Sequence, residues 1–334
     1  MYKLTEENFG SHDKITVESS NVQFAFCLTG ATPLSLEFKK GEKFLPVIDG
    51  YQTPEEFDSS SGSRNWIMTP FANRVVDNKY TFRGTEYHLV PVPPKQRVIH
   101  GFTSMEKFEM INMRHEFDSL IIRLKNSSIR KGRFEGYPFD ADVYIDYTLS
   151  KDKLSIKVSG HNISNEPIPF WSGWHPYFKT CEEGIEHLRL ELNAKSIILM
   201  DSNFIPLPGN EAYSEISLHP DYDLRPAENI NTKTISGKVF DLCYADLTAN
   251  YDGRFSTTII DDKNKISLRV FQNKGVALIF SGDSLLERKR KSIAVEPMQC
   301  LTNGFNRREF ENDITILPGD TKSFEFGVEL LCRH

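Results

Sequence analysis

Apolar and polar residues alternate along much of this chain. In residues 142–149 (DVYIDYTL) every second side chain is apolar, and the alternation resumes in residues 154–160 (LSIKVSG) after the polar turn SKDK. Two such runs joined by a short turn predict a β-hairpin. The same alternation predicts strands over residues 266–271 (ISLRVF) and 323–330 (SFEFGVEL), and residues 79–90 (KYTFRGTEYHLV) predict another hairpin.

A helical repeat is not sustained over a dozen positions anywhere in the sequence. Residues 284–292 (SLLERKRKS) would form one or two helical turns at most. The 17 prolines and 20 glycines are spread along the chain and do not gather into a linker. Many short strands separated by loops predict an all-β sandwich or barrel, which we expect to be a single domain over residues 1–334.

The composition, with 39% hydrophobic and 26% charged residues, is that of an ordinary soluble globular protein. A net charge of -6 would repel a polyanion on average, which argues against nucleic acid as a partner. No apolar run reaches the roughly 18 residues of a membrane span, and the first residues, MYKLTEENFG, lack the pattern of a signal peptide. The five cysteines are scattered without a CxxC motif, so we expect a reducing compartment, the cytoplasm.

Two stretches in the first third of the chain contain polar residues in apolar surroundings. In TPFANRVVDNKY, Asn73 and Arg74 lie in an apolar patch before a strand, where the arginine could tie the loop to backbone carbonyls or contact a ligand. In VIHGF, His100 follows an apolar run and Gly101 allows a sharp backbone turn. A lone histidine in such a position is more often a core residue than a catalyst.

The stretch FWSGWHPYFK places His175 among aromatic residues and directly before Pro176. The proline favours extended backbone at the histidine and restricts its orientation. A buried turn and a ligand site fit this stretch equally well.

Two acidic residues lie in or at the end of apolar segments: Glu296 in SIAVEPMQ and Asp241 in KVFDLCY. A carboxylate in such a place is costly unless it faces solvent, a partner or a substrate. Residues 287–291 (ERKRK) are expected to form a solvated loop. No P-loop, GxGxxG, GxSxG or HExxH motif occurs, so nucleotide hydrolysis, hydride transfer and the commonest hydrolase chemistries have no support.

Taken together, these stretches resemble the aldose 1-epimerase (galactose mutarotase) family, from the segment GATPLSLEF (residues 30–38) to the carboxyl end. They occur in the family's order: ANR, a KYTFRGTEYHL-like hairpin, IHGF, GYPF with YTL, WHPYF, VFD and VEP. The resemblance implies a large antiparallel β-sandwich, often called a supersandwich, with few short helices. It also implies an isomerase that interconverts the α and β anomers of free aldoses.

The resemblance further implies roles for single residues. His175 in WHPYF matches the histidine that acts as general acid on the ring oxygen, and Glu296 in VEP matches the carboxylate that acts as general base on the anomeric hydroxyl. Three more residues match positions that hold and polarise the sugar: Asn73, Arg74 and His100. Asp241 matches an acidic residue that binds sugar hydroxyls.

Ring opening of a pyranose needs one acid and one base and requires no cofactor or metal. A carboxylate near its ordinary pKa and a histidine that titrates near neutrality would serve around pH 7. The aromatic residues around His175 would stack on the sugar and exclude water, and Pro176 would orient the imidazole. The expected partner is a small-molecule sugar, with no nucleic acid or membrane, and the protein is expected to be a monomer or a homodimer.

The chain departs from the family pattern in three stretches, which leaves the preferred aldose open. Phe102 stands where galactose enzymes commonly have a second glycine after the histidine. Ala277 and Leu278 stand in the strand where a sugar-binding glutamine is usual, and Pro297 follows the base in place of a threonine.

Three other interpretations stay open. The chain could be a non-catalytic carbohydrate-binding or regulatory protein on the same fold, or an epimerase of a hexose 6-phosphate or other acidic sugar. A metal site built from the two histidines and the two acidic residues would lack a compact ligand spacing. Because Arg74 is the one cation expected in the site, we predict free aldoses over sugar phosphates. A phosphate would instead be contacted by Lys95, Arg97, Lys131 and Arg133.

Overall fold

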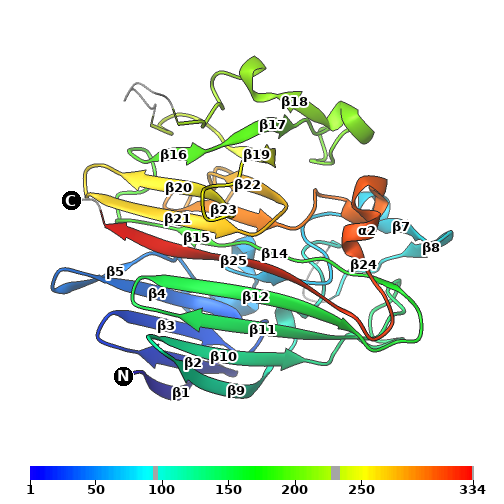
Figure 1. The fold of residues 1–334 in the computed structure, drawn as a ribbon, viewed down its shortest axis with the longest axis horizontal. Helices are drawn as coiled ribbons and strands as arrows, with labels where there is room; N and C mark the ends of the chain where they lie inside the picture. The colour runs from blue at the N-terminus through cyan, green and yellow to red at the C-terminus, as the bar shows by residue number, and fades with distance from the viewer. Residues whose placement is uncertain (93–96, 227–233, 333–334) are drawn as a thin grey trace.

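The structure, a computed structural model, describes residues 1–92, 97–226 and 234–332. Its strands form three large sheets and two small ones, and the pairs within these sheets are antiparallel. One eight-stranded sheet runs from top to bottom in Figure 1, and the two other large sheets lie behind its lower and upper parts. The predicted antiparallel β-sandwich is therefore confirmed.

The front sheet has the order β16-β20-β21-β25-β12-β11-β10-β9. Its strands are β9 (Glu109–Glu116), β10 (Ser119–Asn126), β11 (Ala141–Leu149), β12 (Lys153–Asn162), β16 (Arg189–Leu192), β20 (Phe255–Asp261), β21 (Ile266–Gln272) and β25 (Thr321–Cys332). The lower rear sheet contains β1 (Lys3–Phe9), β2 (His12–Glu18), β3 (Val22–Cys27), β4 (Thr32–Lys40) and β5 (Lys43–Pro46), paired in that order.

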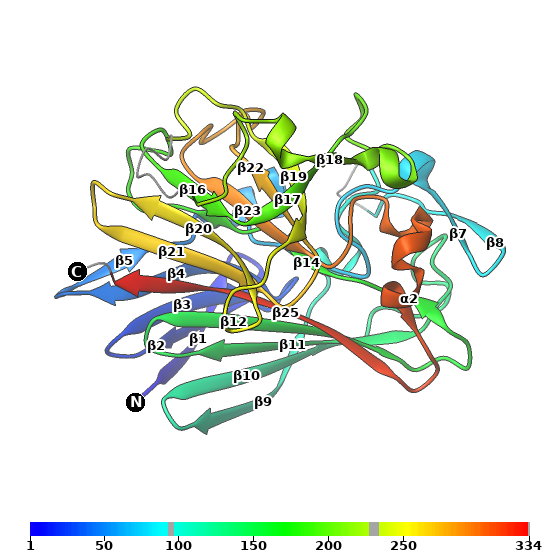
Figure 2. The same ribbon diagram turned by 45° about the horizontal axis from the view of Figure 1, so that its top comes forward.

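The upper rear sheet has the order β18-β17-β19-β22-β23-β14-β6, and β15 also pairs with β23. Its strands are β6 (Ile67–Met68), β14 (Gly173–Trp174), β15 (Tyr177–Phe178), β17 (Ala194–Ile198), β18 (Tyr213–Glu215), β19 (Asp241–Leu247), β22 (Val276–Phe280) and β23 (Ile293–Met298). Figure 2 turns this sheet toward the viewer and shows β22 and β23 in its middle.

The small sheets pair β7 (Lys79–Phe82) with β8 (Thr85–His88) and β13 (Ile168–Pro169) with β24 (Thr315–Ile316). Helices are short: α1 (Pro54–Asp58) and α2 (Glu311–Ile314), with single 3₁₀ turns between strands. No helix in the described ranges is long and apolar enough to cross a membrane.

Two of the predicted elements are hairpins, and the structure contains both. In β11 and β12 Leu149 lies opposite Leu154, and in β7 and β8 Phe82 lies opposite Thr85. The alternation holds in burial too, because Ile145 and Tyr147 of β11 are buried while Tyr144, Asp146 and Thr148 are only partly covered. Residues 284–292, for which at most two helical turns were expected, form turns and bends without a helix.

Aromatic side chains join the layers. Phe24 of β3 packs edge-on against Tyr147 of β11, with ring centroids 5.1 Å apart. Trp174 of β14 stacks on Phe326 of β25 at 5.6 Å. These contacts belong to a continuous apolar core shared by all three large sheets, so the upper rear sheet is a rigid base for side chains on its other surface.

Candidate active site

His175 lies in the short connection between β14 and β15, and its backbone is held on both sides. Its N–H donates to the carbonyl of Trp66 at 3.0 Å, and its carbonyl accepts from the N–H of Asn65 at 2.9 Å. The Asn65 side chain also accepts the N–H of Tyr177 at 3.1 Å. The segment before β6 therefore fixes the backbone around the histidine.

The register of the sheet places Glu296 opposite this histidine. Gly173 of β14 pairs with Met298 of β23, and Tyr177 of β15 pairs with Ala294 of the same strand. The same register continued through residue 175 puts His175 directly across from Glu296. Directly opposed side chains in antiparallel strands point to the same face with Cβ atoms about 4.5–5.5 Å apart.

The two side chains meet as this register requires. Nε2 of His175 lies 3.3 Å from Oε1 of Glu296, and the side chains are 9% and 2% exposed. Nδ1 of His175 and Oε2 of Glu296 have no hydrogen-bond partner among the described residues. Buried polar atoms without partners are costly, so these two atoms are candidates for contact with a ligand.

Burial shifts both titrations of this pair. It lowers the pKa of His175 to about 4, and the positive charges of Arg64 and Arg74 act in the same direction. It raises the pKa of Glu296 well above its ordinary value; the negative charge of Asp241 adds to this rise and Arg74 opposes it. The expectation of a carboxylate near its ordinary pKa and a histidine titrating near neutrality was therefore wrong. Removal from water disfavours the charged form of each group, and neither has a partner that outweighs this.

Two hydrogen bonds join Asn73 and His100, one between backbone groups and one from a backbone N–H to a ring nitrogen. The N–H of His100 donates to the carbonyl of Asn73 at 3.0 Å, and the N–H of Asn73 donates to Nδ1 of His100 at 3.2 Å. A ring nitrogen that accepts a backbone proton carries a lone pair, so in neutral His100 the proton is on Nε2. The His100 ring meets the His175 ring edge-on, with centroids 5.2 Å apart.

The predicted sharp turn at Gly101 is present. Gly101 has a φ of +66°, and a Cβ at this position would lie 1.9 Å from the carbonyl oxygen of Thr69. Because Gly101 has no Cβ, its backbone can lie against the carbonyl of Thr69. This contact brings the segment that contains His100 next to the segment that contains Asn73.

Arg74 and Asp241 lie near His175 and Glu296. Asn73 Oδ1 accepts from both the backbone N–H and Nη1 of Arg74 at 2.9 Å, which orients the guanidinium. Burial lowers the pKa of Arg74, while the charges of Asp241 and Glu296 oppose that shift. Asp241 opens β19 across from Phe280 of β22, and burial raises its pKa, with Arg74 opposing. All six residues predicted for the site thus lie in one neighbourhood.

The aromatic residues around His175 were expected to stack on a sugar, and most of them cannot. Phe170, Trp171, Trp174 and Phe178 are at most 3% exposed and belong to the core. Only Tyr177 stacks on the imidazole, with centroids 5.1 Å apart and planes 25° apart. The four core rings exclude water from behind the histidine and offer no face to a ligand, because they are buried inside the sandwich.

A buried ionic group behind Tyr177 was missed from the sequence. The Arg64 guanidinium lies over the Tyr177 ring and donates to Oδ2 of Asp49 at 2.9 Å. Arg288 donates to Oδ1 of Asp49 at 2.6 Å and also pairs with Glu56. Asp49 ends an apolar run, the same signal that marked Glu296, and could have been found by it.

The expected solvated loop ERKRK is only partly solvated. The side chains of Arg288 and Arg290 are 18% and 14% exposed, and Arg290 donates to Glu186 and Asp283. A run of basic residues is solvated only when no acidic side chain from another segment forms ion pairs with it. Here Asp49, Glu186 and Asp283 do so.

The cations named for a phosphate are scattered. Arg97 lines a cavity together with Arg74, and its charge adds to the lowering of the Arg74 pKa. Arg133 instead pairs with Glu106 at 3.0 Å, and Lys131 is exposed. Lys95 lies outside the described residues.

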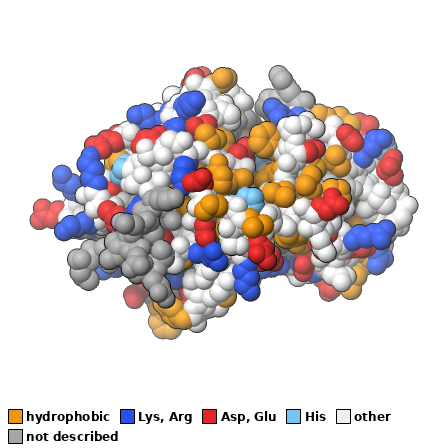
Figure 3. Space-filling view, turned by 90° about the horizontal axis from the view of Figure 1, so that it is seen from above, with side chains coloured by type: hydrophobic (Ala, Val, Ile, Leu, Met, Phe, Trp, Pro, Cys, Tyr) orange, Lys and Arg blue, Asp and Glu red, His pale blue; other side chains and the backbone are white. Residues whose placement is uncertain are grey.

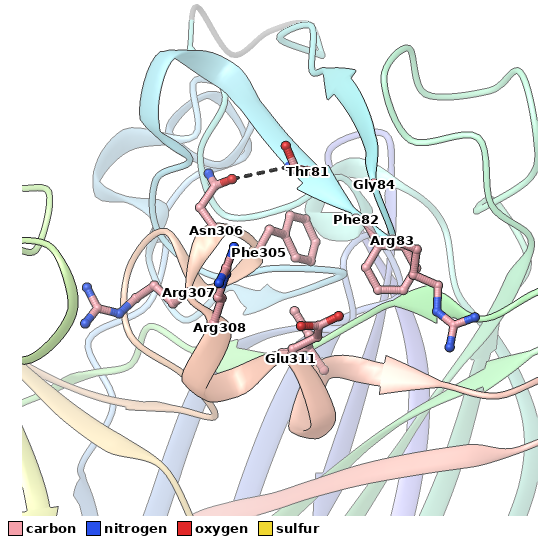
Figure 4. Close-up of a pocket in the computed structure, with 10 residues that line it drawn as sticks. Thr81, Phe82, Arg83, Gly84, Phe305, Asn306, Arg307, Arg308 and Glu311 are labelled. Carbon is pink, nitrogen blue, oxygen red and sulfur yellow. Dashed lines mark hydrogen bonds between the residues drawn. The ribbon is translucent and has the colours of Figure 1, made fainter.

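Figure 4 shows a different cavity, of about 620 Å³, between β7–β8 and the segment before α2. None of the six predicted residues lines it. Arg307 points away from it and donates to the carbonyls of Leu207 and Gly209.

Three potential metal ligands come within 4.8 Å of one another in the described part of the chain: Cys181, Glu183 and His187. Glu183 already pairs with Lys263 at 2.5 Å, and His187 with Asp261 at 3.2 Å. The four residues considered as a metal site do not form such a group.

Comparison with known proteins identifies the family of the chain. A sequence model of the aldose 1-epimerase family matches residues 13–329. The chain is 24% identical over 244 residues to the uncharacterised protein YihR of Escherichia coli, covering 72% of this chain and 71% of that protein. It is 23% identical over 202 residues to the galactose mutarotase of Mus musculus, covering 59% and 57% of the two chains.

Among solved structures, the galactose 1-epimerase from Lactobacillus acidophilus superposes with a TM-score of 0.79 at 18% identity, covering 100% of this chain and 99% of that one. This likeness shows the fold. With the family match over nearly the whole sequence, it leads to one assignment: the chain belongs to the aldose 1-epimerase family.

Proposed function

We propose that this protein is an aldose 1-epimerase that interconverts the α and β anomers of a free hexose by acid–base opening and closing of the ring. The observation that carries the proposal is the contact of 3.3 Å between Nε2 of His175 and Oε1 of Glu296, each with a second polar atom left without a partner. The ring oxygen and the anomeric oxygen of a pyranose are bonded to the same carbon. An acid and a base that serve both must therefore lie close together, as these two groups do.

In the proposed reaction, the Glu296 carboxylate takes the proton of the anomeric hydroxyl. The C1–O1 bond becomes a carbonyl as the bond between C1 and the ring oxygen breaks, and protonated His175 gives its proton to the ring oxygen. Rotation about C1–C2 presents the other face of the aldehyde. The return step moves both protons back: Glu296 protonates the carbonyl oxygen while His175 takes the proton of the attacking hydroxyl.

The pair needs only one shared proton for this cycle. Because burial disfavours charge on both groups, the resting form has a neutral His175 facing the carboxylic acid of Glu296. This is also the form that remains after ring opening. The charge-separated form, in which His175 holds the proton, is required when the closed ring reacts. Sugar hydroxyls that enter the site would lower the free energy of this charge-separated form, because they would hydrogen-bond to the unpartnered Oε2 of Glu296 and Nδ1 of His175.

The remaining residues would hold the sugar. His100, with its proton on Nε2, is a donor, and Arg74 is a donor oriented by Asn73. Asp241 is an acceptor for hydroxyls and its charge is balanced by Arg74. We propose that the protein acts in the cytoplasm on a small-molecule sugar.

The test is polarimetry on freshly dissolved α-glucose and α-galactose with wild-type protein, Glu296→Gln and His175→Asn. Each general acid–base contribution is worth about 10²–10⁴-fold, so each variant should lose at least about a hundredfold in turnover. The double variant should lose little more, because one proton transfer is of little use without the other. Surface variants Glu287→Gln and His88→Asn serve as matched controls and should retain wild-type activity.

Sugar binding, measured by calorimetry or ligand-detected NMR, separates this proposal from a non-catalytic carbohydrate-binding protein. The proposal expects binding to survive in both variants. If the wild-type protein binds sugar but does not speed mutarotation, the binding protein is the better assignment. If Glu296→Gln is folded, binds sugar and keeps near-normal turnover, the assignment of the base is wrong.

A further inference from the structure

The connection between β15 and β16 gathers three side chains of the kinds that bind metal ions. The sulfur of Cys181, a carboxylate oxygen of Glu183 and a ring nitrogen of His187 all lie within 4.8 Å of one another. Over the ranges that the structure describes, histidine, cysteine and acidic residues form no second group of this kind. None of the three residues belongs to the candidate active site, so the proposed reaction does not account for the group.

The separations within the group are close to those of a zinc site. Zinc bonds to sulfur, nitrogen and oxygen are about 2.0–2.3 Å long, which sets tetrahedral ligands about 3.3–3.7 Å apart. Sγ of Cys181 lies 3.8 Å from Nε2 of His187. The side chain of Glu183 is 63% exposed, so its carboxylate can turn toward an ion without disturbing the core.

The loop that carries the group is anchored to the rest of the molecule. Ile185 and Leu188 are buried in the core, and the N–H of Ile185 donates to the carbonyl of Arg290 at 3.1 Å. Gly184 approaches the same carbonyl so closely that a Cβ would lie 2.7 Å from its oxygen. Because His187 lies between the two buried side chains, its backbone is fixed before any ion binds.

A cation already lies at this group. Nζ of Lys263 pairs with Oε2 of Glu183 at 2.5 Å and also interacts electrostatically with Cys181 and Asp261. The hydrogen bond to Glu183 is the main cause of a raised pKa of Lys263. Both side chains of this ion pair are exposed, and exposed pairs contribute little to stability. A divalent ion can therefore displace the ammonium group from Glu183 at little cost.

The partner of His187 can release its ring nitrogen. Nε2 of His187 lies 3.2 Å from Oδ2 of Asp261, whose side chain is fully buried. The same oxygen accepts from the hydroxyl of Thr180 at 2.6 Å and from the side chain of Asn264 at 2.8 Å. Asp261 therefore keeps hydrogen bonds when His187 turns to an ion, and no buried group loses its last partner.

The chemistry of the three ligands selects zinc. Zinc accepts thiolate, imidazole and carboxylate ligands together, whereas magnesium and calcium take oxygen ligands. One thiolate and one carboxylate balance the two charges of the ion, and a neutral imidazole adds none. A water molecule would fill the fourth tetrahedral position on the exposed side of the group.

We propose that Cys181, Glu183 and His187 bind a zinc ion that stabilises the connection between β15 and β16. This site is separate from the proton transfer at His175 and Glu296, and it does not rest on the proposed function. Because the three ligands are brought together only in the folded chain, zinc should stabilise the protein against unfolding.

The test titrates the full chain, first freed of metal with a chelator, with Zn²⁺ by calorimetry and with Co²⁺ by absorption spectroscopy. One Zn²⁺ should bind per chain and raise the melting temperature. Co²⁺ should give a thiolate-to-cobalt charge-transfer band and the intense visible bands of tetrahedral cobalt. Equal binding of Mg²⁺ or Ca²⁺ would overturn the site, because it would indicate an acidic surface that holds any divalent ion.

Single substitutions identify the ligands. Cys181→Ser, Glu183→Gln and His187→Ala should each weaken Zn²⁺ binding at least about tenfold, since even the loss of a group behind a zinc ligand costs that much. Cys181→Ser should also remove the charge-transfer band. Lys263→Met should tighten binding by up to about fivefold, because the competing ammonium group is gone. Undiminished Zn²⁺ binding in Cys181→Ser, or weaker binding in Lys263→Met, would overturn the ligand set.

His88→Ala is the control for loss of a surface histidine. His88 pairs with Glu86 at 2.8 Å, but neither residue belongs to a group of three potential ligands within the described residues. This variant should bind Zn²⁺ as the wild type does. If Cys181→Ser fails to fold, the exposed position of Glu183 still gives an answer: equal Zn²⁺ affinity in Glu183→Gln and wild type, or a wild-type cobalt spectrum without the charge-transfer band, would refute the site.

Discussion

The guanidinium of Arg64 lies over the ring of Tyr177, 4.6 Å from its centroid, and the same ring stacks on the imidazole of His175, with centroids 5.1 Å apart. The Tyr177 ring thus contacts both a buried cation and the candidate acid. The cation is held by Asp49, which also accepts from Arg288 and from Ser292. This ionic group supports the histidine from behind and contributes to the lowering of its pKa.

Arg64→Met should destabilise the fold by about 3–5 kcal/mol, because it removes one partner from a buried ionic group. Urea unfolding measures the difference. The control is Arg114→Met, since the ion pair of Arg114 with Glu116 is exposed, and such pairs contribute about 0–1 kcal/mol. Equal effects of the two substitutions would contradict a stabilising role for the Arg64 group.

The pH dependence of mutarotation should follow the one-proton state of the acid–base pair. On the acid side, activity falls when the pair takes up a second proton, which His175 binds. The midpoint of this fall should lie near the lowered pKa of His175, about 4. On the alkaline side, activity falls when the shared proton leaves, which the raised pKa of Glu296 moves well above an ordinary glutamate. Initial rates by polarimetry from pH 3.5 to 10, corrected for the spontaneous reaction, give the profile. An acid limb with its midpoint at the ordinary histidine value of about 6.5 would show that burial does not set this titration.

Glu296→Gln should stabilise the folded protein increasingly as the pH rises. The folded wild-type protein holds the Glu296 proton more tightly than the unfolded chain, so its stability decreases with pH above the unfolded value of about 4.3 until the raised folded pKa is passed. Glutamine has no proton to lose. Thermal unfolding at pH 5, 7 and 9 should therefore show a difference from wild type that grows with pH, and a difference that stays constant would contradict the raised pKa of Glu296.

Gly101→Ala should damage both stability and catalysis, because its Cβ would meet the carbonyl oxygen of Thr69 and displace the segment that carries His100. Gly84→Ala is the control: Gly84 has a φ of +81°, but its Cβ would meet nothing within 4 Å. We expect a loss of about 1 kcal/mol for Gly84→Ala and more than about 3 kcal/mol for Gly101→Ala. Similar melting temperatures for the two variants would show that the close approach at Gly101 is unimportant.

Free sugars should be better substrates than sugar phosphates. Arg74 and Arg97 line one cavity and are accompanied there by Asp77 and Asp201. The face seen in Figure 3 mixes basic, acidic and hydrophobic side chains. Comparison of kcat/KM for glucose and glucose 6-phosphate is the measurement. A value at least tenfold higher for the phosphate, equivalent to about 1.4 kcal/mol of transition-state binding, would overturn the prediction.

The strands could be predicted from the sequence because alternation is a local signal. Ile145 and Tyr147 point into the core, and their neighbours along the strand do not. The six site residues were found through motifs in a family order, since nothing local distinguishes His175 in a buried turn from His175 in a site. The register that sets it across from Glu296 joins distant segments, and no periodicity within either segment encodes it.

The shifted pKa values could not be predicted either, because they too depend on contacts between segments that are distant in the sequence. The pKa values of His175 and Glu296 depend on how much water the surrounding core excludes, which is a property of the packed structure. Arg288 seemed solvated because its sequence neighbours are charged, whereas its partner Asp49 comes from the other end of the chain.

Because β14 and β15 both pair with β23, strand register fixes one part of the candidate site. The other part lies on connecting segments. The spacing of His175 and Glu296 is set by strand register, so a shift of β23 by one residue would turn Glu296 to the opposite face and separate the two side chains. The side chains proposed to hold the sugar, including Arg74 and His100, lie on connecting segments instead. Substitutions in these segments can therefore leave unchanged the register that sets the spacing of His175 and Glu296.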